Sequence, residues 1–267
     1  MTFPARRILV PDDFTPASGC AWEWAYRFAS SNAPLESLFV WELPPAPVMG
    51  LPAPALSPRV RKELQVRMRK ERPEAKLWTV ETGNAVSAIL RRAKRSDLVV
   101  MCSHGRTGVA RAVFGSVTEA VIRESPVPVL VARGGGADVK KVLAPVVGRP
   151  YAYKGLLLAA ETAAFMNAEL VMLHVTPPGE REGNPRFAVE SMVERLPKEL
   201  REKTRPRLIL RGGDPIPTIL AAAQRHDLVV MTAHRKSLLG DLVLGTTVER
   251  VLRHSPVPVL AAPSDGG

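Results

Sequence analysis

The sequence predicts an α/β protein with two tandem domains, each a doubly wound parallel sheet with helices on both faces. The first observation is a duplication: residues 97–132 recur as residues 227–262, with 18 identities in 36 positions. The second is that each half alternates short apolar runs with helical patterns five times, as expected for strands that are buried on both faces. The third is the length of 267 residues, which suits two domains of ordinary size.

The first half begins with an apolar strand at residues 6–11, which Asp12 and Asp13 follow directly. We expect Thr15 or Ser18 to cap the next helix, because hydroxyl side chains favour that position. The pattern then predicts a strand at 35–41, a basic helix at 58–72, a strand at 76–81, a turn at 83–84 and a helix at 85–95. The Pro-rich residues 43–58 are interpreted as a lid over a ligand or as a spacer.

The duplicated segment completes each half with a strand, a loop, a helix and a final strand. Its first copy carries Gly105 and Gly108 in the loop and ends that loop at Gly115. We expect Ser116 and Glu119 to form a capping box at the start of the helix, and Thr246 with Glu249 to repeat it. Such a helix start favours an anion, because its free amides and positive dipole end face the loop.

Residues 133–139 contain three consecutive glycines and are predicted to link the two domains, which we place at residues 1–136 and 137–267. The second half repeats the order of the first. Its predicted elements are a strand at 141–145, a helix at 152–166, a strand at 169–175, a helix at 186–203, a strand at 207–211, a turn at 212–214, a helix at 216–224 and the second copy of the duplicated segment.

Composition limits the function classes. The net charge of +11 is spread through the chain without a basic tail or an aromatic strand face, so nucleic-acid binding is not favoured. No apolar run reaches the roughly 18 residues of a membrane span, and no signal peptide is indicated. Cys20 and Cys102 fit no metal or redox spacing, and we therefore expect a reducing, cytoplasmic location.

Both halves resemble the universal stress protein family, and the whole chain resembles its tandem-domain members. The residues that carry the resemblance are ILVPDDFTPAS at 8–18 and the pattern Cys102-x2-Gly105-x9-Gly115-Ser116, followed by SPVPVLV. The resemblance implies a Rossmann-like sheet of five parallel strands in the order 3-2-1-4-5. It also implies that the final strands, in which Pro128 and Pro258 indicate an edge, pair as they do across a dimer in the family. Here that pairing would form an intramolecular pseudo-dimer, with a homodimer as a further possibility; alternatively the prolines only prevent aggregation.

The family's nucleotide-binding branch implies that the first half holds ATP, with or without Mg²⁺. Pro11 and Asp13 would lie at the adenine, Glu42 near the ribose through its backbone, and residues 101–105 and 115–118 around the ribose and phosphates. The candidate residues are Pro11, Asp12, Asp13, Glu42, Met101, Cys102, His104, Gly105, Arg106, Gly108, Gly115, Ser116, Val117 and Thr118.

The second half departs from the pattern. Thr232 and Arg235 replace the first two positions of the glycine pattern, and Val147 stands where the first half has Asp13. Arg235 and Lys236 would supply positive charge to a phosphate instead. The corresponding candidates are Pro145, Val147, Val175, Met231, Thr232, His234, Arg235, Gly245, Thr246, Thr247 and Val248.

No P-loop, nucleophile elbow or metalloprotease motif occurs, and no nucleophile–base pair can be assembled. The chain is therefore expected to hold a nucleotide without fast catalysis. Three hypotheses remain open: an ATP-binding stress-response or signalling module with an unknown protein partner, a slow ATP hydrolase, and a protein-interaction module that needs no nucleotide.

Overall fold

A computed structural model of the chain describes residues 3–15, 18–42, 56–102, 115–134, 136, 138–179, 183–238 and 241–263. In the first half its elements are β1 (Ile8–Pro11), α1 (Gly19–Phe28), β2 (Leu35–Trp41), α2 (Pro58–Glu71), β3 (Leu77–Thr82), α3 (Ala85–Ala93), β4 (Leu98–Cys102), α4 (Ser116–Glu124) and β5 (Val129–Ala132). These elements match the predicted ones, with ends that differ by three residues at most, as is usual where helices and strands fray.

The second half contains β6 (Lys141–Pro145), η2 (Pro150–Ala152), α5 (Tyr153–Met166), β7 (Glu169–Thr176), α6 (Pro185–Glu194), α7 (Lys198–Thr204), β8 (Arg207–Gly212), α8 (Pro215–Ala223), β9 (Leu228–Ala233), β10 (Arg235–Leu238), β11 (Asp241–Leu244), α9 (Thr246–His254) and β12 (Val259–Pro263). The single helix predicted at 186–203 is wrong. Pro197 precedes the first turn of α7 and cannot donate a helical hydrogen bond, so α6 and α7 are separate helices. The β10–β11 hairpin was not predicted, because its apolar residues do not alternate clearly with polar ones.

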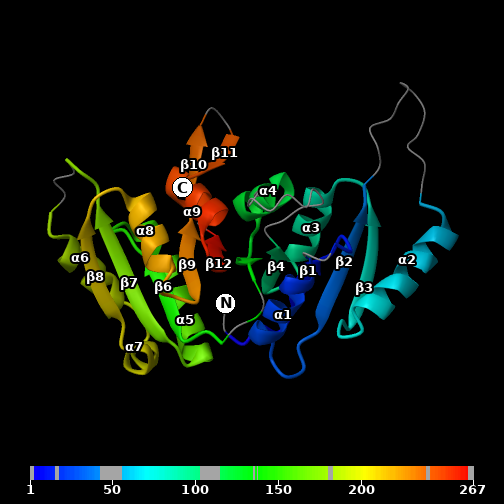
Figure 1. Cartoon of the computed structure of the whole chain (residues 1–267), viewed down its shortest axis with the longest axis horizontal. Helices are drawn as coiled ribbons and strands as arrows, with labels where there is room; N and C mark the ends of the chain where they lie inside the picture. The colour runs from blue at the N-terminus through cyan, green and yellow to red at the C-terminus, as the bar shows by residue number, and fades with distance from the viewer. Residues whose placement is uncertain are drawn as a thin grey trace.

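The strands of both halves form one ten-stranded sheet in the order β3-β2-β1-β4-β5-β12-β9-β6-β7-β8 (Figure 1). Each half thus has the predicted order 3-2-1-4-5, with parallel neighbours throughout. One apolar cluster on each face of the sheet runs through both halves: the first includes residues of α1 and α5, and the second residues of α3, α4, α8 and α9. Among the described residues, no helix is long and apolar enough to span a bilayer.

The two halves join where β5 pairs with β12, and this pair is antiparallel. Leu130 lies opposite Leu260, and both side chains are fully buried. The intramolecular pseudo-dimer is therefore confirmed, whereas a homodimer and the boundary between residues 136 and 137 stay predictions. Pro128 and Pro258 stand just before these strands, and their carbonyl oxygens accept hydrogen bonds from Val99 and Val229.

Polar contacts reinforce the junction beside the sheet. Nη2 of Arg133 donates to the carbonyl oxygens of Leu252, at 2.5 Å, and Arg253, at 3.2 Å, which lie in the last turn of α9. Arg253 also lies 3.8 Å from the Glu119 carboxylate of α4. This ion pair ties the start of the first-half helix α4 to the end of the second-half helix α9, and both helices lie near the middle of Figure 1.

We expect the Leu130→Ala variant to lose about 2–5 kcal/mol of unfolding free energy, because it opens a cavity where the two halves meet. The measurement is urea unfolding followed by circular dichroism. Val66→Ala is the control, because Val66 is 59% exposed on α2 and its truncation should change the free energy by no more than about 0.5 kcal/mol. Equal effects of the two substitutions would show that packing between β5 and β12 contributes little to the free energy of unfolding.

Candidate functional site

A pocket of about 280 Å³ lies at the carboxyl ends of β1, β2 and β4, beside the start of α4. Ligands of open α/β sheets bind at this edge. All predicted site residues of the first half that the structure describes line this pocket: Pro11, Asp12, Asp13, Glu42, Met101, Cys102, Gly115, Ser116, Val117 and Thr118. The other four candidates, His104, Gly105, Arg106 and Gly108, lie outside the described residues, as do residues 43–55 of the Pro-rich segment.

The start of α4 differs from the prediction. Gly115, in extended conformation, precedes the helix, and its carbonyl oxygen accepts from the Glu119 amide at 3.0 Å. Ser116 is therefore already inside the first turn, and no side chain caps the helix, so the predicted capping box is wrong. α9 starts in the same way after Gly245, with no side-chain cap. The amides of a first turn have no helical partner, so each of these two helix starts offers N–H donors beside its pocket.

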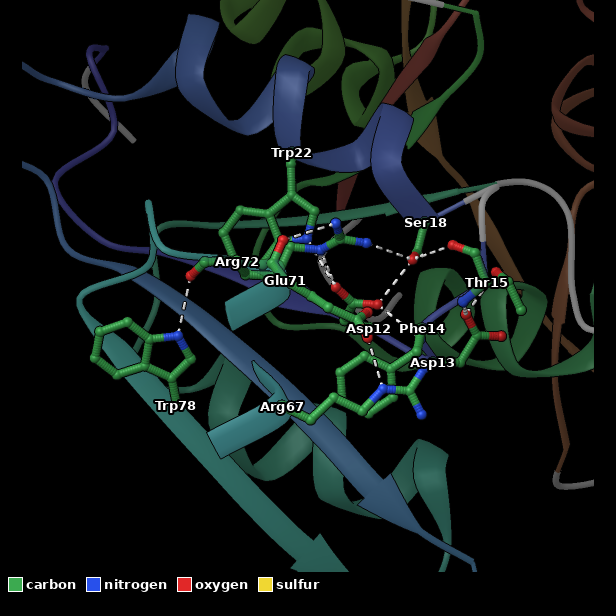
Figure 2. A network of polar contacts seen from close by, with 10 residues as sticks. All are labelled: Asp12, Asp13, Phe14, Thr15, Ser18, Trp22, Arg67, Glu71, Arg72 and Trp78. Atoms are coloured by element: carbon green, nitrogen blue, oxygen red, sulfur yellow. Dashed lines mark hydrogen bonds and ion pairs between the residues drawn. The ribbon is translucent and has the colours of Figure 1, made fainter. Parts of the chain in front are cut away.

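A buried carboxylate organises the first pocket (Figure 2). Oδ1 of Asp12 accepts hydrogen bonds from the Phe14 amide, at 2.8 Å, and the Ser18 hydroxyl, at 2.7 Å. Oδ2 accepts from the Trp22 indole, at 2.9 Å, and from Nε of Arg72, at 2.5 Å. These four donors come from α1, from α2's C-terminal end and from the loop between β1 and α1. Ser18, one of the two predicted caps, stands at the N-cap of α1, but its hydroxyl donates to Asp12 and makes no capping hydrogen bond.

The ionisation of Asp12 follows from these contacts. Burial by itself raises the pKa of this carboxyl, but the hydrogen bonds from Arg72, Ser18, Trp22 and the Phe14 amide outweigh burial, and the pKa is lowered. A lowered pKa in the folded state means that the charged carboxylate contributes stability above the unfolded value of about 4, and that this contribution is lost as the pH falls through the lower, folded value.

Aromatic contacts hold Phe14, and hydrogen bonds hold Asp13, in the loop between β1 and α1. Phe14 has a positive φ of 60° and stacks on Phe39 of β2, with ring centroids 4.8 Å apart. The guanidinium of Arg67 lies 4.2 Å from the centre of the Phe14 ring. Asp13 accepts from the Thr15 amide and hydroxyl through Oδ1 alone, at 3.1 and 2.7 Å. Its Oδ2 makes no hydrogen bond within the described residues, so Asp13 keeps an acceptor for a ligand.

Sequence reasoning missed Arg67 and Arg72 as supports of this pocket. The sequence predicts a basic helix at 58–72 but indicates no role for it in a site, because charged side chains on a helix are usually solvated. A usable signal was present: the Asp12 side chain directly follows a buried strand, and such a charge needs a cationic partner.

A second pocket, of about 400 Å³, occupies the equivalent place at the ends of β6, β7 and β9. Ten of the eleven predicted residues line it: Pro145, Val147, Val175, Met231, Thr232, His234, Gly245, Thr246, Thr247 and Val248. The eleventh, Arg235, is the first residue of β10 and its side chain is not described.

The two pockets differ in the ionisable residues that line them. The described lining of the first contains the carboxylates of Asp12, Asp13 and Glu42 and no Lys, Arg or His. The described lining of the second contains Arg149, His174 and His234 and no Asp or Glu. Within the described residues, no group of three or more His, Cys, Asp or Glu side chains is arranged to hold a metal ion.

Two contacts shape the second pocket. The rings of Tyr151 and His234 stack with centroids 4.0 Å apart. His174 is buried, and its Nδ1 lies 3.1 Å from the Val146 carbonyl oxygen. Because a carbonyl oxygen only accepts, Nδ1 carries the proton, which leaves Nε2 as the acceptor in the neutral ring.

Comparisons with known proteins agree with this architecture. The sequence profile of the "Universal stress protein family" matches twice, at residues 4–133 and 138–263. A universal stress protein of Methanocaldococcus jannaschii is 30% identical over 141 residues, which cover 48% of this chain and 82% of that protein. One of Mycobacterium bovis is 25% identical over 192 residues, which cover 66% of this chain and 65% of that protein, so this chain matches less than two thirds of its length. The crystal structure of a universal stress protein from Archaeoglobus fulgidus has a TM-score of 0.74 and 21% identity, and the match covers 97% of this chain and 98% of that one. At that identity the likeness concerns the fold alone.

We expect Arg72→Met to cost about 3–5 kcal/mol of unfolding free energy at neutral pH, because it leaves the buried Asp12 charge without its cation. The loss should shrink as the pH falls below about 4 and through the lowered folded pKa of Asp12, because a protonated carboxyl needs no cation. Urea unfolding at pH 7 and pH 3.5 measures both effects.

The control for this experiment is Arg59→Met, which removes an ion pair to Glu63 whose two side chains are 89% and 60% exposed. This substitution should change the free energy of unfolding by no more than about 1 kcal/mol at either pH. If Arg72→Met cost no more than the control, Asp12 would not depend on Arg72.

Proposed function

Because the chain belongs to the universal stress protein family and carries that family's domain twice, we propose that it binds ATP in the first pocket and acts as a nucleotide-dependent stress-response module. The observation that carries this proposal is the start of α4. Its first-turn amides lack a side-chain cap and stand beside a pocket at the strand ends. This arrangement suits a phosphate group, because the N–H donors and the helix dipole both favour negative charge.

The rest of the first pocket suits the adenosine part. An exocyclic amine and ribose hydroxyls are donors, and Asp13 and Glu42 supply acceptors in the lining. Leu38, Ile89 and Met101 add apolar surface against which a base packs. Mg²⁺, where it accompanies ATP, would be held mainly by the phosphates and waters, as is usual for nucleotide sites.

Asp12 takes a positioning role in this proposal. Both of its oxygens are occupied by hydrogen bonds from the protein, so it holds the loop that presents Asp13 and does not itself need a ligand. Arg72 acts through Asp12 in the same way, from the end of α2.

We propose binding without fast turnover, because the sequence offers no nucleophile–base pair for hydrolysis. A change of surface on nucleotide binding, read by a protein partner, is the mode of action that we propose; the cytoplasmic location expected from the sequence stays a prediction.

The second pocket is less suited to adenosine. Val147 stands in the place of Asp13, and the described lining offers no carboxylate to accept from an amine or a ribose hydroxyl. The first-turn amides of α9 and the nearby Arg149 would hold an anion, but the nucleoside would lack carboxylate acceptors. We therefore propose one ATP per chain, bound in the first half.

We expect Gly115→Val to weaken ATP binding at least about tenfold, or 1.4 kcal/mol, because its side chain would occupy space beside the α4 amides. Within the part of the chain that the structure describes there is room for a side chain: a Cβ on Gly115 would meet only the Thr118 hydroxyl, at 3.9 Å, and φ is −68°. Loss of binding would thus report on the ligand and not on folding. The measurement is isothermal titration calorimetry with ATP and Mg²⁺.

The matched control is Gly245→Val at the same position of the second half, where a Cβ would meet the His234 carbonyl oxygen at 3.6 Å. That variant should bind ATP like the unmodified chain. Unchanged affinity in Gly115→Val, or an equal loss in both variants, would contradict the assignment to the first pocket.

Calorimetry should also give a stoichiometry of one ATP per chain, because within the described linings only the first pocket carries carboxylate acceptors for the nucleoside. Equilibrium dialysis with radiolabelled ATP at saturating concentration checks this independently. Two equivalent sites would show that the acceptors of the first pocket are not what selects the nucleotide. If no ATP bound, the hypothesis of a protein-interaction module that needs no nucleotide would be favoured instead.

A further inference from the structure

Two cysteines that lie 82 positions apart in the chain meet beside the first pocket. Cys20 is the second residue of α1, and Cys102 is the last residue of β4, on which α1 packs. Their side chains are hydrogen-bonded to each other, both are partly exposed, and neither is in a disulfide. Cys102 also lines the pocket, so this thiol of the pair is reached from the cavity.

The internal repeat supports this geometry independently. In the second half, Thr232 occupies the position of Cys102, and its Oγ1 accepts from the Gly155 amide in the first turn of α5 at 3.0 Å. In the first half, the Cys102 sulfur accepts a hydrogen bond from the equivalent Ala21 amide in α1. The side chain at this position therefore faces the helix start in both halves. Only the first half adds a second thiol, because Lys154 stands in the place of Cys20.

The surroundings distinguish the two thiols. The hydrogen bond from the Cys102 thiol lowers the pKa of Cys20, and the nearby Arg133 acts in the same direction, whereas burial and Glu23 oppose it. The pKa of Cys102 is raised far above its ordinary value by the same hydrogen bond and by burial. Cys20 also lies in the first turn of a helix, where the dipole favours a thiolate.

Arg133 gives a further sign of an anionic sulfur. Its Nε is buried and has no hydrogen-bond partner within the described residues, while its Nη2 is used at the junction with α9. A buried unpaired donor is costly, and a thiolate on Cys20 would provide the negative charge that this guanidinium lacks.

We propose that Cys20 and Cys102 form a reversible dithiol–disulfide pair that a peroxide oxidises. The Cys20 thiolate attacks one peroxide oxygen, so that an S–O bond forms, the O–O bond breaks, and the leaving oxygen takes a proton to become water or an alcohol. The Cys102 sulfur then attacks the sulfur of the Cys20 sulfenic acid, which forms the S–S bond and releases the hydroxyl with the Cys102 proton as a second water. Two thiols lose two electrons, the peroxide gains them, and a small dithiol reverses the reaction.

The consequence for the pocket rests on the proposed function. A disulfide would draw the Cys102 sulfur out of its contact with the Ala21 amide and fix α1 to the end of β4, so the pocket floor would change. We expect the oxidised chain to bind ATP about fivefold or more differently from the reduced chain. By the same coupling, saturating ATP should change the equilibrium between dithiol and disulfide. Bound ATP should also slow the access of peroxide to the thiols.

The experiment exposes the reduced full chain to hydrogen peroxide, removes the peroxide, and blocks the remaining thiols with an alkylating reagent under denaturing conditions. Intact mass spectrometry and peptide mapping then identify the products. We expect a monomeric chain lighter by two hydrogens, a linked peptide pair containing Cys20 and Cys102, and full recovery of both thiols with dithiothreitol.

The matched variant is Cys102→Thr, which installs the residue of the second half and keeps an acceptor for the Ala21 amide. Its Cys20 should stop at the sulfenic acid, trapped with dimedone, or proceed to the sulfinic acid. In Cys20→Ser, Cys102 should remain a thiol under the same conditions. Thermal unfolding of both variants checks that the fold is kept.

The outcomes separate the two claims. Two unreacted thiols in the unmodified chain, disulfides between chains only, or equal oxidation of each cysteine when it is alone would overturn the pair. A disulfide with unchanged ATP affinity would retain the pair and overturn its coupling to the pocket. A disulfide in a chain that binds no ATP in either state would retain the pair, overturn that coupling and contradict the proposed function.

Discussion

One buried carboxylate holds the first pocket in shape. Asp12 directly follows β1, the central strand of the first half, and is buried, so its charge would be costly if unpaired. Its partners come from α1, α2 and the loop between β1 and α1, so the position of each depends on the others. The second half has Val146 at this place and needs no cation from a neighbouring helix. The network therefore belongs to the half in which Asp13 is kept as a ligand acceptor.

Duplication preserved the backbone and changed the chemistry. Both halves have the same strand order, a pocket at the same edge and a helix that starts after a glycine without a side-chain cap. Their described linings nevertheless differ, with three carboxylates in the first and one arginine and two histidines in the second. Main-chain amides can serve any anion, so this shared feature sets the general kind of ligand, whereas side chains at the strand ends select among ligands.

The junction connects the two halves through the sheet and through α4 and α9. Because β5 pairs with β12, neither half exposes its last strand, and the apolar clusters on both faces continue from one half into the other. Arg133 bonds to the end of α9 and lies near Cys20. The thiol pair is therefore close both to the first pocket and to the contact between the halves, which is a suitable place for a signal that both would sense.

The sequence by itself determined the family, the α/β class, the repeat and nearly every strand, because doubly buried parallel strands leave a clear apolar pattern. It also gave the described pocket residues, since the carboxyl ends of parallel strands meet at one edge. The start of α4 could not be read from it: whether Ser116 precedes the helix or lies within it depends on which carbonyl accepts from the Glu119 amide. Only the tertiary structure decided that Arg72 pairs with Asp12, that Leu130 faces Leu260 and that Cys20 meets Cys102. Those contacts join residues far apart in the chain, and no local pattern specifies which distant side chain fills a given space.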